Sequence, residues 1–174
     1  MGHGDAKKRR HKSVASEDII NIENISLLGH VFEQAGHEIF PSKQPKLFDR
    51  LTKINLDIDL GNLKEAQAAH YLFRNAPNLQ RIELQLIYKG YAAPTSHFWD
   101  SIDRQVGLFR NLGVVVLINF AGSPAELGFL KLLLEEAPVL RKAQINDKGK
   151  LDTEALKHLL KMRRASKDAE IVFI

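Results

Sequence analysis

Residues 75–84 read NAPNLQRIEL, and residues 136–145 read EAPVLRKAQI, so the same pattern returns after 61 positions. Each copy places an Ala-Pro pair before a short alternation of apolar and polar residues. A proline disfavours the helical conformation in the residue before it, so the pair predicts the end of a helix. The alternation predicts a strand, because successive side chains of a strand point to opposite faces. The two segments together indicate an internal helix–strand repeat.

A finer pattern underlies this repeat: an apolar residue, two residues of any kind, an apolar residue, one residue of any kind, and an apolar residue. Its middle positions are 28 to 33 residues apart and are occupied by Ile25, Ile54, Ile82, Val115, Ala143 and Ile171. Apolar residues between these strands follow helical spacing in 63–73, 127–134 and 152–160. Ser123 and Pro124, with Glu126 three residues after the serine, are typical of a helix start.

Strands that recur in one direction with a helix between them predict a parallel sheet, because parallel strands need a crossover connection. We therefore predict an α/β fold, a solenoid like that of leucine-rich-repeat proteins. Its parallel strands would form one face and its helices the other.

Composition excludes several classes of protein. The chain has 174 residues, of which 44% are hydrophobic and 26% charged, the balance of a globular protein. It contains no cysteine, which excludes disulfides and thiolate chemistry. It has no apolar run of the ~20 residues that span a bilayer, so we expect no membrane association. It also lacks HExxH, GxSxG and a glycine-rich phosphate loop, so we predict no catalysis, no cofactor and no metal site.

The net charge of +4 is confined to one end of the chain. Residues 1–16, which we predict to be a disordered tail, contain a basic run made of Lys7, Lys8, Arg9, Arg10 and Lys12. Such a run is typical of a nuclear-import signal, and a solubilising tail is an equal alternative. The rest of the chain is neutral, which argues against nucleic-acid binding by the folded body. The expected compartment is the cytoplasm or the nucleus.

Alternate side chains of the predicted strands face away from the helices and form a candidate partner-binding surface. Its polar candidates are Arg81, Glu83, Lys142 and Gln144, and its apolar candidates are Val114, Val116 and Ile118. Exposed, the three apolar residues would form a patch typical of interaction sites. The interpretation that we favour for this stripe is an internal lid over it, formed by the aromatic residues of the longest repeat, Tyr88, Tyr91, Phe98 and Trp99, with an open docking site as the alternative.

The segment LFRNAPNLQRIEL at 72–84 resembles the repeat of plant F-box/leucine-rich-repeat proteins. FAGSPAEL at 120–127, FLKLLLEEAPVL at 129–140 and RASKDAEIVF at 164–173 resemble the FBD region found at the C-terminus of such proteins. The resemblance divides the chain into leucine-rich repeats over 17–107 and an FBD-like region over 108–174 that continues the solenoid.

This resemblance implies an adaptor role. In the family the F-box binds the Skp adaptor of a cullin–RING ubiquitin ligase, and the repeats hold the protein to be ubiquitinated. Residues 1–21 are too short and polar for an F-box, so we do not expect this chain to bind a Skp-type adaptor. We predict a non-catalytic protein-recognition module, the substrate-binding part of such an adaptor or a truncated remnant of one. The alternative is a nucleic-acid-associated protein that uses the basic tail.

One further motif has two interpretations. Arg163-Arg-Ala-Ser166 matches the pattern of a basophilic kinase site, where a phosphate would add negative charge at a helix end. The resemblance favours a turn that leads into the last strand.

Overall fold

The computed structural model describes residues 24–27, 48–90, 97–103 and 107–174. Six parallel strands form one sheet in the order of the sequence. The strands are β1 (Asn24–Leu27), β2 (Lys53–Ile58), β3 (Arg81–Leu86), β4 (Val114–Ile118), β5 (Lys142–Asn146) and β6 (Glu170–Phe173). The six predicted middle residues are register partners in this sheet, from Ile25 beside Ile54 to Ala143 beside Ile171. The predicted parallel sheet is therefore confirmed.

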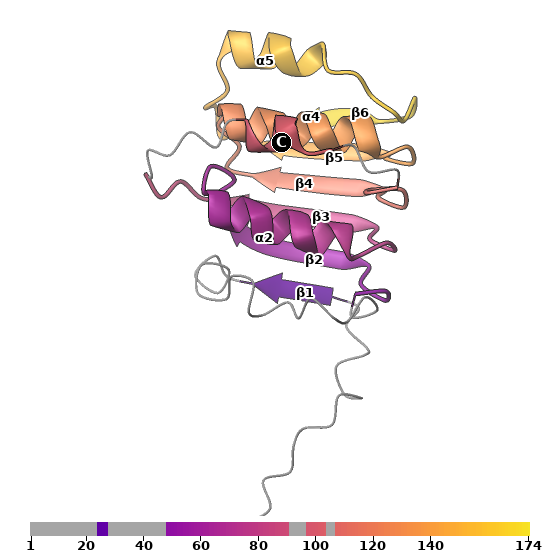
Figure 1. Ribbon diagram of the computed structural model, residues 1–174. Coiled ribbons are helices and arrows are strands. Elements are labelled where there is room, and N and C mark those ends of the chain that lie inside the picture. Colours follow the sequence, from indigo (N-terminus) through magenta and orange to yellow (C-terminus); the bar gives the residue numbers. More distant parts are fainter. Residues whose placement is uncertain (1–23, 28–47, 91–96, 104–106) are drawn as a thin grey trace, which may run out of the picture.

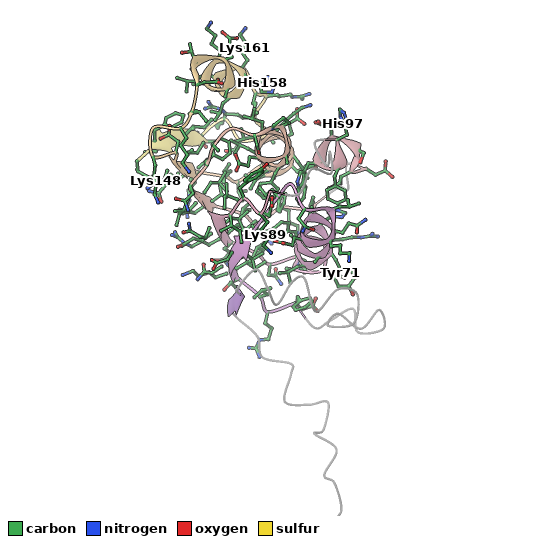
Figure 2. All side chains as sticks on the ribbon, turned by 90° about the vertical axis from the view of Figure 1, so that its left-hand side faces the viewer. Tyr71, Lys89, His97, Lys148, His158 and Lys161 are labelled. Atoms are coloured by element: carbon green, nitrogen blue, oxygen red, sulfur yellow. The ribbon has the colours of Figure 1, made fainter. Side chains whose placement is uncertain are left out.

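The helices lie on one face of the sheet (Figures 1 and 2). They are α2 (Leu63–Arg74), α3 (Phe98–Ser101), α4 (Pro124–Glu136) and α5 (Thr153–Leu160). In Figure 1, α2 lies in front of β2 and β3, and α4 in front of β5. Within the described residues no helix covers the other face, which we call the open face.

Both long helices begin at a side-chain cap. The Ser123 hydroxyl accepts a hydrogen bond from the Glu126 N–H at 3.3 Å, and the Glu126 carboxylate accepts one from the Ser123 N–H at 3.0 Å. This reciprocal cap satisfies two donors that a helix start leaves free, and it confirms the predicted start of α4. Asn62 is the residue before α2, as Ser123 is before α4. Its side-chain oxygen accepts a hydrogen bond from the Lys64 N–H at 3.0 Å and so caps α2.

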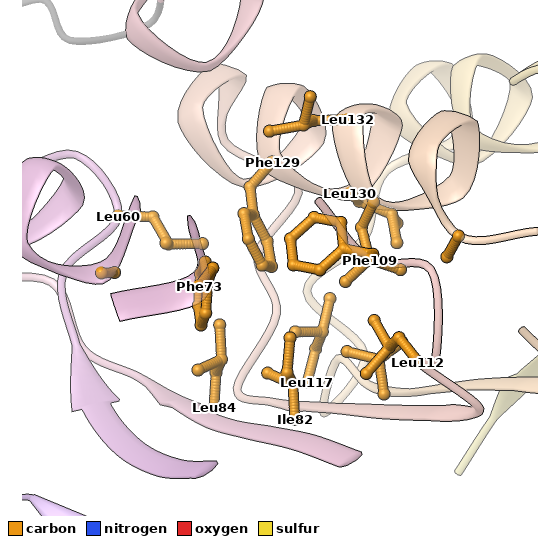
Figure 3. Close-up of a cluster of buried hydrophobic side chains, with 14 of the residues drawn as sticks. Leu60, Phe73, Ile82, Leu84, Phe109, Leu112, Leu117, Phe129, Leu130 and Leu132 are labelled. Atoms are coloured by element: carbon orange, nitrogen blue, oxygen red, sulfur yellow. The ribbon is translucent and has the colours of Figure 1, made fainter. Parts of the chain in front are cut away.

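The core lies between the sheet and the helices (Figure 3). Side chains of β2 to β5 that face the helices are at most 4% exposed. Three aromatic rings join α2, α4 and the turn before β4: the ring centroid of Phe73 of α2 lies 5.6 Å from that of Phe109 and 5.9 Å from that of Phe129 of α4. Burying a side chain of this size contributes ~1.5–3 kcal/mol, so this cluster is a principal source of stability.

The long repeat between β3 and β4 adds to this core instead of covering the open face. Trp99 of α3 is 1% exposed, its ring centroid lies 4.9 Å from that of Phe129, and its indole N–H donates to the Leu60 carbonyl at 3.3 Å. Phe98 packs edge-on against His70 of α2. The predicted lid is therefore wrong for these rings: α3 lies in the helix layer beside α4, and burying its aromatic side chains there adds to the core. Tyr88 is 87% exposed and covers nothing, and Tyr91 lies outside the described residues.

Candidate protein-interaction surface

The strand register arranges the side chains of the open face in three rows that run across the sheet. The row nearest the strand starts consists of Lys53, Arg81, Val114, Lys142 and Glu170. The middle row consists of Asn55, Glu83, Val116, Gln144 and Val172. The third row consists of Asp57, Gln85, Ile118 and Asn146. All seven residues predicted for the partner-binding surface therefore lie side by side on one face.

No described aromatic residue covers the apolar stripe on β4, which consists of Val114, Val116 and Ile118. The stripe is nevertheless only partly exposed to solvent. Val116 is 6% exposed, and its register neighbours Glu83 and Gln144 flank it with longer side chains. Val114 and Ile118 are half-buried. The expected continuous apolar patch is thus replaced by a mixed surface, in which polar side chains surround a valine at the centre.

One ion pair lies on this surface. The Arg81 guanidinium lies 3.2 Å from the Glu83 carboxylate, on the same strand and the same face. Both side chains are about one-third exposed (39% and 32%), so water screens the pair and its contribution to stability is small.

Four turns beside the open face are a feature that sequence reasoning missed. Each turn precedes a strand, and the turns span 48–51, 76–79, 109–112 and 137–140. In each turn the N–H of the last residue donates to the carbonyl of the first, at 3.0, 3.2, 3.1 and 3.3 Å. We call this side of the sheet the turn edge; it is the right-hand side of Figure 1, where each strand begins.

Asparagine side chains connect the turns. The Asn78 amide donates to the Asp49 carbonyl of the preceding turn at 2.7 Å, and the Asn111 amide donates to the Pro77 carbonyl at 3.0 Å. Asparagine at the third position of both turns was the sequence signal for this ladder. The next turn has Val139 at that position, which cannot donate, and the ladder ends there.

A hollow of about 350 Å³ opens where the ladder ends, lined by Gln80, Asn111, Gly113, Val139 and Arg141. Gly113 lines it with backbone atoms alone. The Arg141 guanidinium lies over this glycine, so close that a Cβ at position 113 would be 3.3 Å from Nη2. The backbone of Gly113 and the cationic side chain of Arg141 therefore both line the hollow.

The opposite edge of the sheet carries a buried ionic cluster whose role is structural. The Glu65 carboxylate, fully buried, accepts from the Asp59 N–H at 2.8 Å and from the Lys89 ammonium at 2.6 Å. The Asp59 carboxylate in turn accepts from the Lys89 N–H at 3.0 Å. These bonds fix the chain that leaves β3, and they occupy the oxygens that an acid–base role would need.

Among the described residues two groups, Glu126 and His70, have shifted pKa values, and both lie in the helix layer. Burial raises the pKa of Glu126, although hydrogen bonds from Ser123, Ala121 and Gly122 act in the opposite direction. Burial lowers the pKa of His70, and the nearby Arg74 charge lowers it further. Neither group reaches the open face.

Ser166 of the candidate kinase motif is 5% exposed, and its hydroxyl donates to the Leu140 carbonyl at 2.6 Å. This contact supports the turn interpretation, because a buried, bonded hydroxyl is unavailable to a kinase. The basic run at 7–12 lies outside the described residues.

The described part of the chain contains no group of three or more His, Asp or Glu side chains placed to hold a metal ion. None of its helices is both long and apolar enough to cross a membrane. No protein-family model, no curated protein and no solved structure matches this chain. The resemblance to F-box/FBD proteins therefore stays a prediction from the sequence.

Proposed function

We propose that this chain is a leucine-rich-repeat-like solenoid that recognises another protein through its open face. The observation that carries the proposal is the register, which holds side chains of consecutive strands in continuous rows on a face that no described helix covers. Solenoid proteins use such repeated surfaces to bind partners. The mixture of charged, amide and apolar side chains suits a protein surface, where a small apolar centre is surrounded by polar groups.

The resemblance places this recognition in an F-box ubiquitin-ligase adaptor, with the bound protein as the ubiquitination target. In this proposal the chain has no catalytic role of its own. The hydrogen-bonded Glu65, Asp59 and Lys89 support a structural use of its buried charges.

Affinity capture from plant extract with two matched variants tests the proposal. Gln144→Arg adds a long cation at the centre of the open face, while Gln67→Arg makes the same change on the exposed surface of α2. We expect the wild type and Gln67→Arg to capture the same proteins and Gln144→Arg to lose them. Capture of nothing above background by the wild type, or equal capture by all three chains, contradicts the proposal.

A further inference from the structure

The part of the turn edge that precedes β2, β3, β4 and β5 carries an excess of positive charge, and Glu170 at the start of β6 lies outside it. The four turns and the two residues after each of them span 48–53, 76–81, 109–114 and 137–142. These segments contain one acidic residue, Asp49, and their basic residues are Arg50, Lys53, Arg81, Arg110, Arg141 and Lys142. The corresponding segments where the strands end, 57–62, 85–90, 118–123 and 146–151, contain equal numbers of acidic and basic residues. A chain whose body is neutral overall is therefore basic along one edge.

In the part of the chain that the structure describes, most of these cations form no ion pair. Arg81 pairs with Glu83, but the described residues give no ion pair or side-chain hydrogen bond to the other five, Arg50, Lys53, Arg110, Arg141 and Lys142. We call these five residues the turn-edge patch. They belong to the turns and strand starts of β2, β4 and β5, and neighbouring strands lie about 4.8 Å apart, so charges of one sign gather at this end of the sheet. Lys89, on the opposite edge, is held by the Glu65 carboxylate.

We propose that the turn-edge patch binds an acidic peptide segment of a protein partner, with one carboxylate in the hollow beside Gly113. This inference rests on the proposed function, because it names the chemistry of the partner. The Arg141 guanidinium lines the hollow, and its planar fork matches a carboxylate with two parallel hydrogen bonds.

The apolar content of this edge favours a peptide over a nucleic acid. Val139 is 51% exposed and lines the hollow, and Val114 lies between Arg81 and Lys142 in the first row. Apolar side chains of a peptide would cover these valines, whereas a phosphate backbone would gain nothing from them. Single-stranded nucleic acids also use aromatic side chains for stacking, and the described turn-edge segments expose none.

The dimensions of the turn-edge patch set the length of the peptide segment that can cover it. The step from β2 to β5 covers three strand spacings, roughly 14 Å, which an extended peptide spans with about four residues. The expected ligand is a short stretch with carboxylates near its ends and an apolar residue between them.

Fluorescence anisotropy with a labelled peptide of alternating glutamate and leucine tests this binding. The turn-edge variant is Arg141→Glu with Lys142→Glu, and the matched control is Lys148→Glu with Lys150→Glu, which makes the same charge change on the opposite edge. We expect the control to bind as the wild type does and the turn-edge variant to bind at least ~10-fold more weakly. The basic run at 7–12 is present in every chain, so its contribution cancels.

A third variant separates a specific site from general attraction between charges. Gly113→Ala leaves the net charge unchanged and places a methyl group 3.3 Å from the Arg141 guanidinium, inside the hollow. We expect weaker peptide binding by this variant with an unchanged thermal midpoint, and in the wild type peptide-induced NMR shifts at the Gly113 and Arg141 amides.

Three results would overturn the inference: equal weakening by both charge variants, no effect of Gly113→Ala, or binding of a single-stranded oligothymidine without binding of the peptide. Each is distinguishable from failure of the proposed function, because capture by the open face in extract is measured separately with Gln144→Arg. Loss of capture by that variant, together with no peptide binding, would leave the recognition function in place and reject the acidic ligand.

Discussion

At the scale of single residues, two glutamates explain part of the internal repeat. Glu65 and Glu126 are 61 positions apart, and each is the third residue of a long helix. The carboxylate of Glu65 accepts from the Asp59 N–H, and that of Glu126 accepts from the Ala121 N–H at 2.9 Å. In both repeats the carboxylate thus binds the chain that leaves the preceding strand. The glutamate recurs because it fixes the strand-to-helix connection.

His70 gives a prediction about pH. Its Nε2 atom is buried without a hydrogen-bond partner in the described structure, and its pKa is lowered from an ordinary value of 6.5. Below pH 6.5 the unfolded chain therefore binds a proton that the folded chain resists. The stability contribution of neutral His70 is present above this pH and is lost as the pH falls through the lowered pKa.

We expect His70→Phe to reduce the loss of stability between neutral and mildly acidic pH, since phenylalanine keeps the ring contact with Phe98 and cannot titrate. Urea unfolding at several pH values measures this slope. The control is His158→Gln, which replaces an exposed histidine. An unchanged slope in His70→Phe would show that the histidine does not titrate with folding.

At the scale of elements, the turns behave as a second ladder beside the sheet. The third turn residue donates to the preceding turn at Asn78 and Asn111, but Val139 breaks the series. The Arg110 carbonyl, which an asparagine at 139 would reach, accepts no hydrogen bond within the described residues.

We expect Val139→Asn to stabilise the fold by about 1 kcal/mol, the net value of one such hydrogen bond. Val139→Leu is the matched control, because leucine has the shape of asparagine and no donor. Urea unfolding of the three chains measures the difference. If both variants change the free energy of unfolding equally, the ladder does not extend to this turn.

The same elements show what the sequence could predict. The alternation around Ile54, Ile82 and Val115 placed the strands correctly, because one buried face imposes a period of two. The position of α3 was not predictable in this way. Four residues carry too little periodicity to say which face Trp99 covers, and its place depends on Phe129, 30 positions later.

The sequence also predicted only part of the candidate surface. Strand alternation placed Arg81, Glu83 and Gln144 on the open face, as the register requires. It could not give the burial of Val116, which depends on neighbours from two other strands. The turn-edge patch was missed because its cations are dispersed along the chain and become neighbours only through the register.

At the scale of the whole molecule, the burial of side chains is unequal along the sheet. The central repeats share the Phe73, Phe109 and Phe129 cluster, whereas α5 buries only Leu159 completely. The end of the chain also exposes apolar side chains, with Leu160 at 59%, Phe173 at 41% and Ile174 at 58%. Within the described residues β6 pairs with β5 alone, so this last strand is held from one side.

We therefore expect α5 and β6 to open before the rest of the fold. In native-state hydrogen exchange their amides should be less protected than those of β3 and β4.

Leu159→Ala, which removes a fully buried side chain, should cost the terminal unit ~2–5 kcal/mol and lower its protection further. Trp99 is the single tryptophan and contacts both Leu60, in the connection from β2 to α2, and Phe129 of α4, so its fluorescence reports the centre. Its urea midpoint should stay unchanged in Leu159→Ala. A midpoint that falls together with the protection of α5 would instead show that the six strands unfold as one cooperative unit.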